Sequence, residues 1–171
     1  MKKKILLPVI LCGFCLGLGG ASLLWPKQTR PERIAQLFED ICIKRAKGIA
    51  VSPAAFGVAE YALSYTNWID PLSKTFLDVD NESCSITTFF PEALSFDDAM
   101  ILRDLITQQK AKHFPELQFD PNAQMGSLSV GWFLGEWGSK QRWGIHLFAY
   151  PDRGEDARSS LTIRNPPSFD A

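Results

Sequence analysis

The first 25 residues of this chain determine in which compartment the rest of it folds. Lys2, Lys3 and Lys4 precede an apolar run from Ile5 to Trp25. A basic start followed by an apolar run is typical of an export signal, with the lysines left on the cytoplasmic side. We therefore predict that the remainder of this 171-residue chain matures outside the cytoplasm, in the periplasm or the extracellular medium.

Two fates of the N-terminal segment fit its sequence. The small residues Gly19 and Ala21 predict cleavage after Ala21 and a soluble mature protein. At about 1.5 Å per residue the run is also long enough to span a bilayer, which predicts a single-pass inner-membrane anchor over residues 5–25. The expected domain plan is a signal peptide or uncleaved membrane anchor (1–21), a linker (22–30), a single domain (31–165) and a C-terminal tail (166–171).

The charge balance excludes one class of partner. The chain holds 18 lysines and arginines against 19 aspartates and glutamates, a net charge of −1, and 46% of its residues are hydrophobic. That composition is typical of a globular protein. A nucleic-acid-binding domain generally has a basic surplus, so we expect no nucleic-acid partner.

Two cysteines fall in the exported part, Cys42 and Cys84. An even pair in an oxidising compartment predicts one disulfide between them. Two cysteines without a neighbouring histidine do not make a zinc site. The other two, Cys12 and Cys15, lie inside the apolar run, outside the strand-and-helix context of a redox motif.

The spacing of apolar residues predicts an α+β domain. We expect three helices: 31–47, a second beginning at Ser52–Pro53 and running to about Tyr65, and a third from Ser95 until Pro115 stops it. We expect five strands: 75–79, 83–90, 127–137, 142–150 and 157–164. The fold class is thus a five-stranded antiparallel sheet, made of a hairpin plus a three-stranded meander and packed by about three helices, after the N-terminal signal or anchor helix.

This order of helices and strands resembles that of profilin-like domains, a group that includes many sensing and scaffolding modules. The resemblance covers the order of elements alone, without signature residues. Because one fold can carry many functions, it implies no particular activity.

The first two meander strands carry an unusual pattern of side chains. If the chain turns around Ser139 and Lys140, Trp137 faces Arg142, and one side of the two strands is a continuous apolar surface that we assign to the core. The opposite side alternates glycines with aromatic and polar residues: Ser129, Gly131, Phe133, Gly135, Trp137, Arg142, Gly144, His146, Phe148 and Tyr150. Large exposed apolar patches are uncommon, so either one of the first two helices covers this side or a partner binds it.

We therefore expect a non-catalytic periplasmic module that binds a protein or peptide through this side of the sheet. The candidate binding residues are Phe133, Trp137, Arg142, His146, Phe148 and Tyr150. One alternative is a hydrolase that uses His146 with an acid that the sequence does not identify. Another is a structural component of an envelope assembly.

The sequence contains no motif that predicts a cofactor or a metal. It has no G-x-S-x-G elbow, phosphate-binding glycine loop or H-E-x-x-H. The acidic stretch Asp78–Glu82 departs from the EF-hand pattern, because Ser83 stands where that loop requires glycine. We expect neither a cofactor nor a metal site, and we read the stretch as a hairpin turn.

Overall fold

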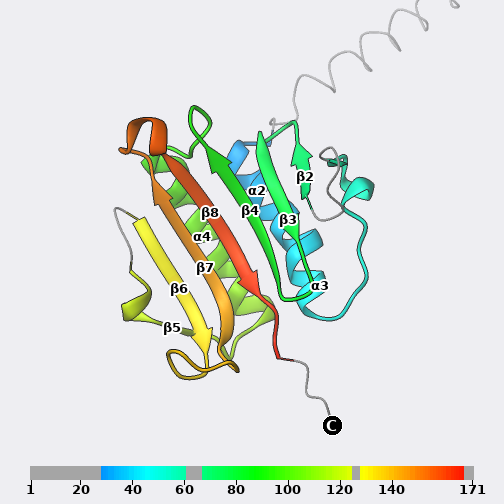
Figure 1. The fold of residues 1–171 in the computed structure, drawn as a ribbon, viewed down its shortest axis with the longest axis vertical. Coiled ribbons are helices and arrows are strands. Elements are labelled where there is room, and N and C mark those ends of the chain that lie inside the picture. Colours follow the sequence, from blue (N-terminus) through cyan, green and yellow to red (C-terminus); the bar gives the residue numbers. More distant parts are fainter. Residues whose placement is uncertain (1–27, 61–66, 125–127, 168–171) are drawn as a thin grey trace, which may run out of the picture.

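The computed structural model describes residues 28–60, 67–124 and 128–167, and its strands form one antiparallel sheet with helices on one side (Figure 1). The sheet has eight strands in the order β1-β2-β3-β4-β8-β7-β6-β5. The strands are β1 (Ala59–Glu60), β2 (Asn67–Asp70), β3 (Thr75–Val79), β4 (Ser83–Phe89), β5 (Gln118–Phe119), β6 (Leu128–Leu134), β7 (Trp143–Tyr150) and β8 (Arg158–Arg164).

The first helix changes its hydrogen-bonding pattern midway. It begins as α2 (Arg30–Leu37), continues as the π-helical segment η1 (Phe38–Ile43) and ends as α3 (Lys44–Ala46). Thr29 caps it: the Thr29 hydroxyl accepts a hydrogen bond from the N–H of Glu32, whose carboxylate accepts one from the Thr29 N–H. This capping box satisfies two N–H groups that the first helical turn leaves without partners.

The second helix, α4 (Phe96–His113), lies where the sequence predicts it. The Ser95 hydroxyl accepts a hydrogen bond from the N–H of Asp98, as expected for an N-cap. The apolar side chains of Ala99, Leu102 and Ile106 are buried. They help to form the core between this helix and the sheet.

The two halves of the sheet repeat one arrangement. In each half a helix is followed by a two-residue edge strand and then by three longer strands that form a meander. The last strands of the two halves, β4 and β8, pair at the centre of the sheet, from Ser83 opposite Arg164 to Phe89 opposite Arg158. The short edge strands β1 and β5 offer few unpaired backbone groups to other chains.

The prediction of five strands and three helices is wrong: the sheet has eight strands, and the described residues contain two helices. The segment expected as a second helix holds only the 3₁₀ turn η2 (Pro53–Phe56) before β1, and residues 61–66 lie outside the described part. Gly57, with φ of +76°, ends that turn. The expected loop over 66–73 contains β2, which is too short for its pattern to reveal a strand.

The meander shows the predicted faces but not the predicted register. Leu134 pairs with Trp143, whereas the sequence suggested Trp137 opposite Arg142. Because side chains alternate with a period of two, a shift of two residues leaves each on its predicted side. The chain leaves the ladder earlier because Gly135, with φ of +94°, begins a longer turn.

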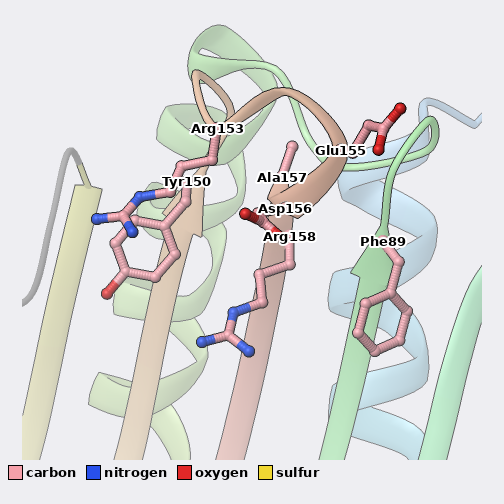
Figure 2. Close-up of a pocket in the computed structure, with 7 residues that line it drawn as sticks. All are labelled: Phe89, Tyr150, Arg153, Glu155, Asp156, Ala157 and Arg158. Atoms are coloured by element: carbon pink, nitrogen blue, oxygen red, sulfur yellow. The ribbon is translucent and has the colours of Figure 1, made fainter.

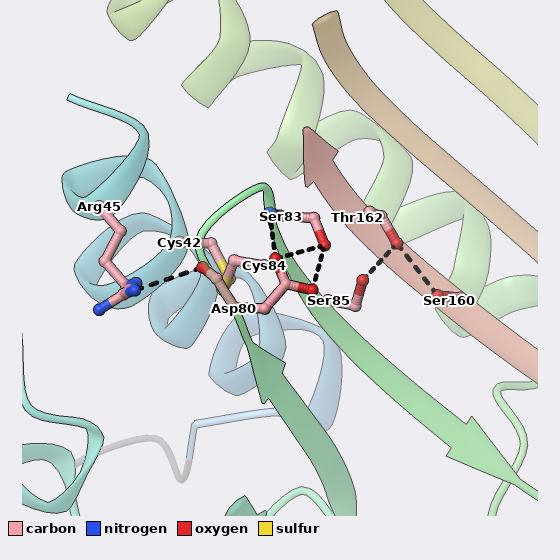
Figure 3. The surroundings of a disulfide bond; sticks show 8 residues. All are labelled: Cys42, Arg45, Asp80, Ser83, Cys84, Ser85, Ser160 and Thr162. Carbon is pink, nitrogen blue, oxygen red and sulfur yellow. Dashed lines mark hydrogen bonds between the residues drawn. A yellow bond between two sulfur atoms is a disulfide. The ribbon is translucent and has the colours of Figure 1, made fainter. Parts of the chain in front are cut away.

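The predicted disulfide between Cys42 and Cys84 is confirmed, and it joins η1 to β4 (Figure 3). Both cysteines are fully buried. Beside the bond, the Asp80 carboxylate accepts hydrogen bonds from the N–H groups of Glu82 and Ser83, closing the turn between β3 and β4. This intramolecular disulfide is consistent with an oxidising compartment, periplasmic or extracellular.

The predicted signal or anchor, with Cys12 and Cys15, lies outside the described residues. Within residues 28–60, 67–124 and 128–167, no helix combines the length and the apolar character that crossing a bilayer requires.

Candidate binding surface

In the described part of the chain, both helices lie on one side of the sheet, and no helix covers the other side (Figure 1). We call this side the outer face. The opposite side packs against the helices through buried residues such as Leu77, Ile86, Ile145, Leu147 and Leu161. One of the two expectations from the sequence was that the first or second helix covers the aromatic side of the meander. The first helix and α4 instead both lie on the other side, and residues 53–60 form η2 and β1.

Four of the predicted binding residues form a row of rings on the outer face, along β6 and β7. We call Phe133, His146, Phe148 and Tyr150 the aromatic row. Consecutive ring centroids are 6.2, 5.7 and 5.3 Å apart. Each of these side chains is partly exposed, as expected of a pleated strand whose alternate residues point outward.

The other two candidates, Trp137 and Arg142, lie in the turn between β6 and β7. The Arg142 guanidinium is 4.1 Å from the ring centroid of Phe133 and 5.0 Å from that of Trp137, so it stacks between two rings. Trp137 is 72% exposed. The structure thus brings all six predicted residues to one side of the meander.

Arg142 also binds a carboxylate that the sequence analysis missed. Its Nη2 forms an ion pair with Asp120, and its Nη1 donates to the Gly135 carbonyl at 3.1 Å. The hydrogen bond from Arg142, followed by that from the Asn122 N–H, lowers the pKa of Asp120. Asp120 reaches the arginine because the short strand β5 pairs with β6, and no local pattern indicates that pairing.

His146 holds a short segment against the sheet. Its Nε2 is 2.9 Å from the Ser129 Oγ and 3.2 Å from the Ala123 carbonyl oxygen, while the Ser129 hydroxyl donates to that same oxygen at 2.7 Å. Because the hydroxyl has only one hydrogen, His146 is the donor toward Ser129. Burial lowers the pKa of His146, and the Ala123 carbonyl raises it by less, which favours the neutral ring.

A ladder of hydroxyl groups runs beside the aromatic row, at the centre of the outer face. Ser85 lies 2.9 Å from Thr162, Thr87 lies 3.2 Å from Ser160, and Ser160 lies 3.3 Å from Thr162, measured between hydroxyl oxygens. Figure 3 shows three of these four side chains. The outer face is therefore polar in the middle and aromatic along β6 and β7.

One end of the outer face contains a pocket of about 400 Å³ that the sequence analysis did not predict (Figure 2). We call it the arginine pocket. It is lined by Phe89, Tyr150, Arg153, Glu155, Asp156, Ala157 and Arg158. Of these, only Tyr150 was a candidate residue. Arg158 is on the outer face because it pairs with Tyr150, and that register depends on the β7–β8 loop, which the short 3₁₀ turn η4 (Gly154–Asp156) completes.

The arginine guanidinium groups of this pocket lie over rings. Arg153 is 5.0 Å from the Tyr150 ring centroid, and Arg158 is 5.7 Å from that of Phe148. Neither guanidinium has an ion pair or a hydrogen bond within the part of the chain that the structure describes.

In the described ranges, no group of three or more His, Cys, Asp or Glu side chains is placed so that it could hold a metal ion. The chain matches no protein-family profile, no curated protein and no solved structure.

Proposed function

We propose that this protein is an exported, non-catalytic binding module whose outer face receives a protein or peptide. The observation that carries the proposal is an aromatic row with stacked arginines on the side of the sheet opposite the helices. Aromatic residues and arginine are enriched at the centres of protein interfaces, where they supply most of the binding energy.

The proposed location is the periplasm, with the protein either soluble after cleavage or tethered by residues 5–25. The disulfide and the N-terminal sequence support export. Mass spectrometry of the non-reduced protein from separated periplasmic and membrane fractions tests the location, the cleavage and the disulfide. We expect the Cys42–Cys84 bond to be intact; free thiols in a cytosolic product contradict export.

The binding test compares partner recovery from a periplasmic extract by variants of the outer face. We expect Trp137→Ala and Phe133→Ala to reduce recovery, because each removes a ring that stacks with Arg142. Ile101→Ala is the matched control, since Ile101 is an exposed apolar residue on α4. Unchanged recovery with both ring variants removes this surface from the proposal.

A hydrolase is the second candidate, because the Ser129 hydroxyl lies 2.9 Å from His146. A catalytic pair needs the histidine to accept the serine proton, whereas here the serine donates to the Ala123 carbonyl. A fluorophosphonate probe, which labels activated serines, distinguishes the two candidates. If the protein is a hydrolase, the probe labels it and Ser129→Ala abolishes the labelling. If it is a binding module, Ser129→Ala does not change the labelling.

A further inference from the structure

We propose that the arginine pocket binds a carboxylate group of an acidic peptide segment, in which an acidic residue stands beside an apolar one. This inference rests on the proposed function and names the chemistry of the partner at one end of the outer face. Three arginines on this surface, Arg142, Arg153 and Arg158, lie over aromatic rings.

Arg142 provides the template for the other two. Its guanidinium stacks on the rings of Phe133 and Trp137, and its N–H edge holds the carboxylate of Asp120. Stacking on a ring fixes the plane of a guanidinium while leaving its N–H groups free to bind a carboxylate at the edge. At Arg142, therefore, an arginine that lies over aromatic rings also binds a carboxylate.

Arg153 and Arg158 also lie over rings, at 5.0 and 5.7 Å from the ring centroid compared with 4.1 Å for Arg142 over Phe133, but without a carboxylate from the described part of the chain. Arg153 lies over Tyr150 and Arg158 over Phe148, and in Figure 2 both guanidinium groups lie on the same side of the sheet, near Tyr150. Among the described residues no carboxylate pairs with either one. The contacts with the rings already restrict both arginine side chains. Ordering them when a ligand binds therefore costs less conformational entropy.

The lining of the pocket favours a carboxylate over a phosphate. Glu155 and Asp156 lie at the same site as the two arginines, so the charges of the lining sum to zero. A phosphate dianion is attracted by Arg153 and Arg158 more strongly than a carboxylate, but Glu155 and Asp156 repel it more strongly in the same proportion, so a lining without net charge gives the higher charge no advantage. Phe89 and Tyr150 add apolar surface, which suits a hydrophobic residue next to the acidic one in the peptide.

The test is a titration of the ¹⁵N-labelled mature protein, followed through its arginine Nε–H signals. The probes are the capped dipeptide acetyl-Phe-Glu-amide, its neutral counterpart acetyl-Phe-Gln-amide, and inorganic phosphate. We expect saturable shifts at Arg153 and Arg158 with the glutamate peptide alone. Arg153→Gln and Arg158→Gln should each weaken this binding about tenfold or more, since a hydrogen bond to a charged group is lost.

Arg164→Gln is the matched control, because Arg164 is an exposed arginine at the opposite end of β8 and lies outside the pocket. Equal binding of both dipeptides, or binding that survives Arg153→Gln and Arg158→Gln, overturns the inference. Tighter binding of phosphate than of the glutamate peptide overturns the assignment to a carboxylate.

The two proposals fail in distinguishable ways. If Trp137→Ala lowers partner recovery but the glutamate dipeptide does not bind, the outer face remains the binding surface and the pocket inference is wrong. If the dipeptide binds through Arg158 but Trp137→Ala and Phe133→Ala leave recovery unchanged, the pocket stands and the wider surface is wrong.

Discussion

Individual side chains on the outer face are held in place by contacts with neighbouring groups. Phe133 lies beneath Arg142, and His146 is hydrogen-bonded to Ser129 and to the backbone of Ala123. His146 is partly buried, and this burial lowers its pKa. Protonation of His146 is therefore coupled to folding.

His146 should make folding sensitive to mild acid. Its pKa in the folded protein is lowered, so the unfolded chain binds the proton more readily. Stability is therefore full above the ordinary histidine pKa of about 6.5 and falls as the pH drops from there toward the lowered value, by no more than about 1.4 kcal/mol per pH unit.

We expect His146→Gln, which keeps an N–H donor, to reduce this loss. Urea unfolding of both proteins at pH 7.5 and at about pH 5.5 measures the difference, the two values bracketing the ordinary histidine pKa. His113→Gln serves as the comparison, because His113 instead pairs with Glu39. Parallel pH profiles for wild type and His146→Gln contradict the prediction.

Within β7, a glycine lets a ring lie flat on the sheet. Gly144 is opposite Phe133, and a Cβ there would lie 2.1 Å from the Trp132 carbonyl oxygen and 2.8 Å from the Phe133 ring. Its φ is +154°. This strand position therefore has no room for any other residue.

Gly144→Ala should destabilise the protein by about 1–3 kcal/mol more than Gly138→Ala. Both variants place an alanine at a positive φ, but only Gly144→Ala also overpacks its surroundings. Gly138 is the matched control because its φ is also positive, at +80°, yet nothing lies within 4 Å of a Cβ there. Thermal and urea unfolding of the two variants provide the comparison. Equal losses mean that the contact with Trp132 is not limiting.

The first helix and β2 are joined by a buried ion pair. The Arg33 Nη2 lies 2.8 Å from the Asp70 Oδ1, and the same guanidinium group donates to the Phe56 carbonyl. Burial, the largest influence, raises the pKa of Asp70, but hydrogen bonds from Arg33 and Ser73 together outweigh it and leave that pKa lowered. The ionised Asp70 carboxylate therefore contributes stability that is fully present above the ordinary aspartate pKa. This stability is lost as the pH falls through the lowered pKa of the folded protein.

Asp70→Asn should cost about 3–5 kcal/mol of unfolding free energy, because it leaves the Arg33 charge buried without its partner. Asp40→Asn is the control: Asp40 pairs with Lys44 one turn along the first helix, partly exposed, and should cost less than about 0.5 kcal/mol. Urea unfolding near neutral pH compares the two. A loss at Asp70 as small as that at Asp40 indicates that the pair contributes little.

For the whole molecule, the disulfide joins the first helix to the centre of the sheet. It closes a loop with a sequence separation of 42, for which the chain-entropy model gives about 4 kcal/mol of stabilisation. Cys42→Ala/Cys84→Ala should lose about that amount and become insensitive to reductant. Urea unfolding with and without reductant measures both effects, and a wild type equally stable in the two conditions contradicts the prediction.

The elements with strong local patterns could be predicted from the sequence. The N-cap at Ser95, the stripe of α4 and the alternation of β6 and β7 are repeated signals within one segment, so the helix and both strand faces are correct. The four candidates within these strands, Phe133, His146, Phe148 and Tyr150, share one side for the same reason, whereas Trp137 and Arg142 lie in the turn. Edge strands such as β1 and β5 have two residues each and depend on a neighbour for their structure, so no local pattern reveals them.

The sequence alone determined the disulfide pair, the long helix and the side of the meander on which each aromatic residue lies, because period and residue type are local properties. Tertiary structure decided the rest: which side the helices cover, the pairing of β4 with β8, and the meeting of Arg153, Arg158 and Phe89 at one pocket. These are contacts between residues far apart in the chain, and their geometry depends on loop lengths and register that no single segment specifies.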